Sequence, residues 1–177
     1  ALLRAFDIPL VPEQVVANIE DAVAAAERIG FPVVVKGRSA GVAHKSELGL
    51  VAVALDSADA VRSACSAMAR KDKHKPLQGY LVQPMVAGGV EFVVGVKTDK
   101  AMGPAVILAL GGLFVEAYGA PVIEMAPVSA RIAGSMIAAL DKKGILEGYR
   151  TGRPLAQASL AATLQAVGRM AWALRDR

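Results

Sequence analysis

The pattern of apolar and polar positions near the start of the chain predicts a helix followed closely by a buried strand. Asn18, with Asp21 three residues later, is a typical helix start, and apolar residues then recur at helical spacing until Gly30. Residues 31–36 read FPVVVK. Because a short apolar run rich in β-branched residues is typical of a buried strand, we expect Lys36 to stand at the C-terminal end of one.

The rest of the pattern predicts one more helix, a series of strands, and helices at the end of the chain. Ser57 is placed to cap a helix from Asp59 to Ala69, Ser129 begins an Ala- and Met-rich helix, and an Ala/Leu helix follows from Pro154 on. Apolar runs predict strands at 50–55, 79–86, 90–98, 104–110 and 122–128. This order predicts an α+β fold with two lobes, which we assign to residues 1–85 and 86–177.

Composition favours a soluble protein of the cytoplasm. Of the 177 residues 54% are apolar and 20% charged, and no run approaches the roughly 18 consecutive apolar residues that span a bilayer. No secretory signal is visible, and the single Cys65 excludes an internal disulfide. The chain opens abruptly with ALLRAFDIPLVPE, without a helix start signal, so we expect a fragment of a longer multidomain chain.

The net charge of +4 does not indicate a nucleic-acid partner. Most charges are isolated, apart from residues 70–75, which read RKDKHK. Because no aromatic side chains that could stack on bases are interleaved, this run is more typical of a solvated loop than of a nucleic-acid patch. We assign no role to His74 within it.

Two basic residues are candidates for phosphate chemistry. Lys36 could reach a phosphate from a rigid strand end, although a lysine in this place is also commonly a side chain extending into solvent. His44 lies in a glycine-flanked loop directly before Lys45, Ser46 and Glu47. A neutral imidazole can attack phosphorus near pH 7 and Lys45 could stabilise the phosphoryl oxygens, but an exposed loop histidine without a role fits the same spacing.

Two Gly-Gly pairs, each followed by a glutamate, are candidates for a ligand site. Gly111 and Gly112 precede Glu116, and such a pair lets the backbone approach an anion while the carboxylate can hold Mg²⁺. The other pair precedes Glu91, which could accept hydrogen bonds from a ribose. The alternatives are an ordinary turn and a solvent-facing carboxylate. Since the sequence holds no P-loop, dinucleotide fingerprint or Cys/His metal spacing, a nucleotide would be bound in another way.

Four segments occur in a specific order along the chain: FPVVVK, HKSELGLV, LVQPMVAGGVEFVVGV and GPAVILALGGLFVE. In this order they resemble the ATP-grasp module of the ADP-forming acetyl-CoA synthetases and their acyl-CoA synthetase relatives, cousins of the succinyl-CoA synthetase β-subunit. The resemblance covers nearly the whole chain, and its most specific elements are HKS with the following acid and glycine, and GGLFVE. It implies an ATP-grasp fold, with a nucleotide cleft between two α+β lobes.

The resemblance also implies a role for each candidate residue. His44 would be phosphorylated and would relay the phosphoryl group between ADP and an acyl phosphate formed from acyl-CoA and phosphate. Lys36 would contact the phosphates of ATP or ADP, and Glu116 would help to hold Mg²⁺. The nucleotide would also be contacted by a hinge of Gln83, Pro84, Met85 and Val86, by Glu91, and by Gly111 and Gly112. CoA would be bound by CoA-binding and ligase domains of the same or a partner chain.

The sequence departs from the family pattern just after GGLFVE. The family usually continues with a Lys-Asp pair and then an Arg, where this chain has Gly119, Ala120 and Glu124. The missing Asp would remove a magnesium ligand, and a glutamate near phosphates would weaken ATP binding unless it points away. These departures keep a second hypothesis open, a degenerate ATP-grasp module with a regulatory or assembly role, as in synthetase-like protein acetyltransferases. A different ATP-grasp ligase or a carboxylate-amine ligase is a third hypothesis.

Overall fold

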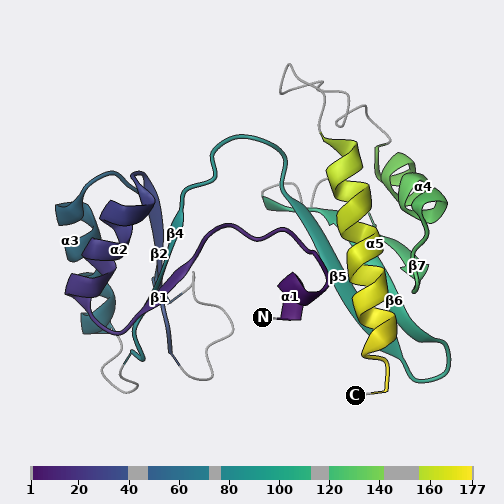
Figure 1. The fold of residues 1–177 in the computed structure, drawn as a ribbon, viewed down its shortest axis with the longest axis horizontal. Helices are drawn as coiled ribbons and strands as arrows, with labels where there is room; N and C mark the ends of the chain where they lie inside the picture. The colour runs from purple at the N-terminus through teal and green to yellow at the C-terminus, as the bar shows by residue number, and fades with distance from the viewer. Residues whose placement is uncertain (1, 40–47, 72–76, 113–119, 142–155, 177) are drawn as a thin grey trace. The chain divides into compact units, whose positions relative to one another are not determined.

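A computed structural model describes residues 2–39, 48–71, 77–112, 120–141 and 156–176 of the chain. It divides into two compact units (Figure 1). The first unit is Val11–Ala87, and the second combines Ala1–Leu10 with Gly88–Arg177. The sequence pattern predicts a boundary between residues 85 and 86, with the first ten residues in the first lobe. In the structure these ten residues pack with the second unit.

The first unit is a four-stranded antiparallel sheet covered on one face by two helices (Figure 1). Its strand order is β1-β4-β2-β3, and we call it the first sheet. The strands are β1 (Gln14–Val16), β2 (Val33–Gly37), β3 (Val51–Leu55) and β4 (Tyr80–Pro84), and the helices are α2 (Ile19–Ile29) and α3 (Ala58–Lys71). The core between sheet and helices includes Val33, Val35 and Val82, each with no exposed surface. Burial of such a side chain stabilises the fold by about 1.5–3 kcal/mol.

The helix starts predicted in this unit are confirmed. The Asn18 side chain accepts a 2.8 Å hydrogen bond from the backbone N–H of Asp21, and Gly30 ends α2 with a φ of +90°. Ser57 Oγ accepts a 3.3 Å bond from the N–H of Ala60. Each contact satisfies a backbone donor that the first turn of a helix leaves free.

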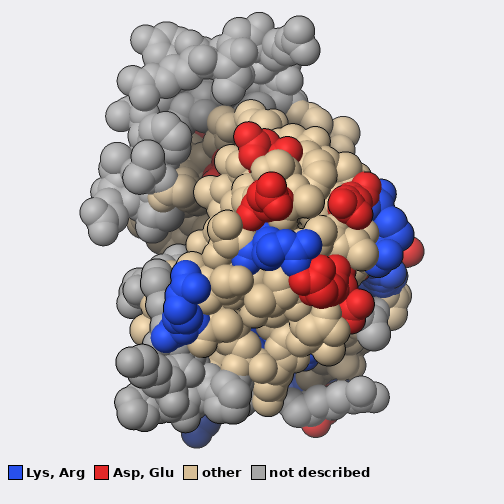
Figure 2. All heavy atoms as spheres, turned by 90° about the vertical axis from the view of Figure 1, so that its left-hand side faces the viewer, with Lys and Arg blue, Asp and Glu red and all other residues tan. Residues whose placement is uncertain are grey.

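The outer face of α2 and α3 carries acidic and basic side chains next to one another (Figure 2). Arg62 of α3 donates a hydrogen bond to the carboxylate of Glu20 on α2. An exposed pair of this kind contributes about 0–1 kcal/mol. The mixture of signs on this face is that of a solvated surface rather than of a one-sign binding patch.

The second unit is a three-stranded antiparallel sheet with two long helices on one face. The strand order is β5-β6-β7, and we call it the second sheet. The elements are α1 (Leu2–Ala5), β5 (Phe92–Asp99), β6 (Gly103–Leu110), β7 (Val122–Met125), α4 (Ala130–Leu140) and α5 (Gln157–Ala173). Ser129 caps α4 as predicted, by accepting a 3.3 Å hydrogen bond from the N–H of Ile132. The helix expected from Pro154 on begins at Gln157 in the described part of the chain.

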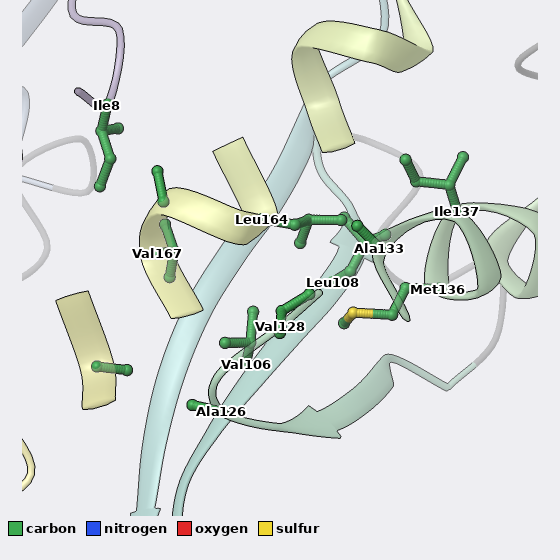
Figure 3. Packing of buried hydrophobic residues seen from close by; sticks show 12 residues of the cluster. Ile8, Val106, Leu108, Ala126, Val128, Ala133, Met136, Ile137, Leu164 and Val167 are labelled. Carbon is green, nitrogen blue, oxygen red and sulfur yellow. The ribbon is translucent and has the colours of Figure 1, made fainter. Parts of the chain in front are cut away.

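The core of the second unit lies between β6 and the two helices. Val106 and Leu108 of β6 meet Met136 of α4 and Leu164 of α5, and Ile8 from the start of the chain joins the same cluster (Figure 3). Among the described helices none is both long and apolar enough to cross a bilayer.

Candidate functional site

Lys36 lies on the face of the first sheet that α2 and α3 leave open. It is paired with Leu81 of β4 and with Val51 of β3. The next residue, Gly37, faces the helices, since a Cβ built on it would lie 3.4 Å from the Leu77 side chain that packs against the helix-side core. Successive residues of a strand point to opposite faces, so Lys36 points away from the helices.

Gln83 shares this face with Lys36. It is the direct partner of Val34, which stands two residues before Lys36 on β2. Gln83 Nε2 donates a 3.3 Å hydrogen bond to Glu13 Oε2. We call the surface formed by Val34, Lys36, Leu81 and Gln83 the open face of the first sheet, because neither helix covers it; Val34 is buried there and the other three residues are half-buried. It combines apolar side chains with one cation and one amide, a mixture typical of small-molecule sites.

The other expected hinge residues follow Gln83 directly. Pro84 is the last residue of β4, and the backbone N–H of Met85 donates a 2.9 Å hydrogen bond to the carbonyl of Pro32. Val86 leaves 66% of its surface exposed. The end of β4 is therefore fixed to the segment before β2, with an uncovered apolar side chain beyond it.

In the second unit, Glu91 lies against Gly111 and Gly112. The backbone N–H of Gly111 donates a 2.7 Å hydrogen bond to the Glu91 carbonyl, which extends the β5–β6 ladder by one residue. A Cβ on Gly111 would be 3.1 Å from Glu91 Cβ, and one on Gly112 would be 2.9 Å from Glu91 Oε2. A side chain at either glycine position would crowd the observed position of the Glu91 side chain. Glu91, Gly111 and Gly112, all predicted site residues, therefore form one group.

Strand alternation separates Glu91 from Glu124. Val106 and Leu108 of β6 face α4 and α5, and Glu124 of β7 is the register partner of Val106. Glu124 therefore projects from the helix-covered face of the second sheet. Val93 of β5 points to the opposite face, because its neighbour Val94 is the partner of Leu108. Glu91, two residues before Val93, points to the same face as Val93. The glutamate that departs from the family pattern thus points away from the face that carries Glu91.

Several residues named in the sequence analysis lie outside the described part of the chain: His44 with the adjacent Lys45, Ser46 and Glu47, His74, Glu116 and Gly119. Ala120 is described and is exposed just before β7. Within the described residues no three His, Cys, Asp or Glu side chains gather as a metal site. The structure thus groups Lys36 with Gln83 in one unit and Glu91 with the glycines in the other.

Sequence reasoning missed Glu13 as a neighbour of Gln83. The two residues are 70 positions apart and meet only through the pairing of β1 with β4. The sequence around residue 13 carries no signal for this pairing. Sequence reasoning also missed Arg38. Because residues i and i+2 of a strand point to the same face, the sequence already placed this second cation on the face of Lys36.

A hollow of about 490 Å³ lies elsewhere, between α4 and α5 of the second unit. It is lined by Gly134, Ile137, Ala138, Asp141, Gln157, Ala158 and Ala161. None of the predicted site residues is among them, so this hollow is separate from both groups.

Several known proteins that are similar to this chain are ADP-forming CoA ligases. A 4-hydroxybutyrate–CoA ligase (ADP-forming) of Nitrosopumilus maritimus is 32% identical over 96% of this chain and 25% of its own length. The β subunit of acetate–CoA ligase (ADP-forming) I of Pyrococcus furiosus is 33% identical over 99% of this chain and 77% of its own length. The chain therefore spans a quarter of the first relative and about three quarters of the second.

A solved structure is similar in fold as well as in sequence. The dinucleotide-forming acetyl-coenzyme A synthetase 1 of Ca. Korarchaeum cryptofilum, in complex with coenzyme A and Ca-AMPCP, matches with a TM-score of 0.90 and 33% identity. The match covers 97% of this chain and 76% of that one. The sequence profile of a family described as "ATP-grasp domain" matches residues 1–176. The chain therefore belongs to the ATP-grasp family, in the branch of the ADP-forming acyl-CoA ligases.

Proposed function

We propose that this chain is the nucleotide-binding part of an ADP-forming acyl-CoA ligase and exchanges a phosphoryl group between ATP and His44. The observation that carries the proposal is the open face of the first sheet. There Lys36 has no ion pair within the described residues and stands beside apolar Val34 and Leu81. A surface that combines apolar side chains with a cation at one end is suited to an aromatic base and a phosphate chain.

For the remaining site residues we propose the roles that the family resemblance implies. Adenine would lie by the hinge from Gln83 to Val86, and the ammonium of Lys36 would contact the phosphates. Glu91 would accept hydrogen bonds from the ribose, or lie beside the phosphates, with Gly111 and Gly112 leaving room for close approach of the backbone.

A magnesium ion would accompany the nucleotide, and Glu116 is the residue that we propose to hold it. Mg²⁺ is commonly bound by one or two carboxylates together with phosphates and water. The absence of a cluster of three ligating side chains among the described residues is compatible with that mode. When bound, the ion would neutralise phosphate charge during transfer.

His44 would be the phosphoryl acceptor. An imidazole nitrogen attacks the γ-phosphorus of ATP, an N–P bond forms, and the bond to the β,γ-bridging oxygen breaks to release ADP; the reverse step makes ATP. The support is the HKSELG segment in a chain related to these ligases. The korarchaeal enzyme has a phosphohistidine segment that points towards its nucleotide-binding site in one structure.

Further domains would complete the reaction. The relatives carry this region as a β subunit or as part of a longer chain, and the korarchaeal structures contain coenzyme A. We therefore propose that CoA-binding and ligase domains, on the same or a partner chain, supply the acyl phosphate.

The test is a phosphorylation assay of the full-length enzyme that contains this chain. With Mg²⁺ and γ-labelled ATP, an acid-labile adduct should form, and His44→Ala should abolish it. Ser46→Ala is the control, because a phosphoserine would survive acid while a phosphoramidate hydrolyses. A wild-type protein without adduct, together with a His44→Ala variant that turns over at the wild-type rate, would favour the degenerate-module hypothesis instead.

A further inference from the structure

Arg38 continues the edge of the first sheet just beyond Lys36. Its backbone N–H donates a 2.9 Å hydrogen bond to the carbonyl of Gly79, and its carbonyl accepts a 2.7 Å bond from the N–H of Gln78. Two residues on the β4 side thus oppose one on the β2 side, as in a β-bulge. The backbone of Arg38 is therefore held in the sheet, although β2 formally ends at Gly37.

The Arg38 side chain belongs to the same face as Lys36. Gly37, between them, faces the helix-side core, where a Cβ built on it would be 3.5 Å from Leu50. The exposure of the three residues alternates as a strand predicts: Lys36 is half-buried, Gly37 is buried, and Arg38 is exposed. Two residues apart on one face, the two Cβ atoms are separated by about 6.6 Å.

No described residue neutralises this pair of cations. Neither Lys36 nor Arg38 makes an ion pair within the described part of the chain. The acid known to lie at this sheet, Glu13, is at the other end, beside Gln83, which pairs with Val34 rather than with Lys36. The two like charges repel each other, and an anion placed between them would relieve that repulsion.

The face therefore has a direction along the strand. Gln83 with Glu13 marks one end, Lys36 comes next, and Arg38 lies farthest from Gln83. A nucleotide with its base near Gln83 would bring its inner phosphates to Lys36 and its outer phosphate to Arg38. The planar guanidinium can bind a phosphate through two parallel hydrogen bonds, which suits it to the terminal group.

We propose that Arg38 binds the outer phosphate of the nucleotide and thereby selects nucleoside di- and triphosphates over the monophosphate. This inference rests on the proposed function, because it takes Lys36 as a phosphate-binding residue. It adds a residue that no part of the family resemblance assigns.

Calorimetric titration of the full-length enzyme with ATP, ADP, AMP and inorganic phosphate tests the proposal. Arg38→Gln should weaken binding of ATP and ADP about tenfold or more, as expected for the loss of charge-assisted hydrogen bonds to the outer phosphate, and should leave AMP affinity unchanged. Arg38→Lys should keep part of the affinity. Arg70→Gln is the matched control, since it removes an exposed arginine from α3 on the other side of the sheet. Because Arg38 is exposed and its side chain makes no hydrogen bond or ion pair with a described residue, its variants should melt at the wild-type temperature.

The outcomes separate this inference from the function on which it rests. If the wild-type enzyme binds ATP and Lys36→Gln weakens it, but Arg38→Gln binds ATP as wild type does, the role of Arg38 is wrong and the nucleotide site stands. Equal losses for AMP and ATP would also overturn it. Weaker binding of inorganic phosphate with unchanged ATP affinity would assign Arg38 to free phosphate and overturn it as well. If the wild-type enzyme binds no nucleotide, the proposed function itself fails.

Discussion

The carboxylate of Glu91 lies directly against Gly112. A Cβ built on this glycine would be 2.9 Å from Glu91 Oε2, and the φ of Gly112 is +63°. The glycine therefore does two things at once: it adopts a left-handed backbone conformation just after β6, and it leaves the space that the carboxylate occupies.

Gly112→Ala should lower both stability and nucleotide affinity. The left-handed backbone conformation costs a residue with a Cβ about 1–2 kcal/mol, and the new methyl group would displace the Glu91 carboxylate. Urea unfolding and calorimetric titration with Mg-ATP measure the two effects. Gly103→Ala is the control, because Gly103 has a φ of +88° but no atoms within 4 Å of a built Cβ. This control should lose stability and keep ATP affinity. ATP affinity at the wild-type level in Gly112→Ala would show that the Glu91 carboxylate does not contact the nucleotide.

Glu91 and Glu124 should respond differently to substitution. Because Glu124 is the partner of Val106 on the helix-covered face, Glu124→Ala should leave ATP affinity within about twofold of wild type. Glu91→Ala removes a charged acceptor from the proposed site and should weaken ATP binding about tenfold. Both residues are exposed, so neither change should alter the melting temperature much. A large gain of ATP affinity in Glu124→Ala would mean that its charge does oppose the phosphates.

Sequence patterns predicted the elements of this fold wherever the signal was local. The caps at Asn18, Ser57 and Ser129 hold as expected, because capping involves residues only three positions apart. The strand ending near Lys36 follows from a continuous apolar run. Strand β1 was missed, since its three residues carry no pattern of their own and become a strand only by pairing with β4.

The geometry of the site was less accessible from the sequence. Glycine pairs and glutamates could be recognised, but the approach of Glu91 to Gly112 depends on the register of β5 against β6. The direction of Glu124 depends in the same way on the register of β7. A shift of one residue would reverse both faces, and register is set by packing across the whole sheet.

Two helix glycines should show opposite effects of the same substitution. Gly168 of α5 packs against Val128, and a Cβ there would be 2.7 Å from the Val128 backbone nitrogen. Gly168→Ala should therefore destabilise the protein by about 1–3 kcal/mol through overpacking. Gly134 of α4 is exposed with nothing within 4 Å, so Gly134→Ala should stabilise it by up to about 1 kcal/mol through helix propensity. Denaturant unfolding of both variants gives the comparison, and a neutral Gly168→Ala would mean that α5 can shift away from Val128.

The last prediction concerns Cys65, which is completely buried between α3 and the first sheet. Burial raises the pKa of its thiol from 9.0 to about 11, because the thiolate would lose its hydration. Unfolding returns the pKa toward its ordinary value. Between about pH 9 and pH 11 the unfolded chain therefore releases a proton that the folded chain keeps, and the free energy of unfolding falls as pH rises through that window. Burial also raises the pKa of Tyr80, whose hydroxyl donates a 3.2 Å hydrogen bond to the Cys65 carbonyl, so Tyr80 adds to the same trend.

Urea unfolding from pH 7 to pH 11 should thus show constant stability at first and a decline above about pH 9. Cys65→Ala should be less stable at pH 7, since it leaves a small cavity, but should show a shallower decline, to which the burial of Tyr80 still contributes. In the native wild-type protein, the thiol should also react slowly with iodoacetamide at pH 8, because it is protonated at that pH and the reagent cannot reach it. In urea it should react at the rate of a free cysteine. A native thiol that reacts as fast as the unfolded one, or a Cys65→Ala variant with an unchanged alkaline slope, would contradict the burial of this residue in the core.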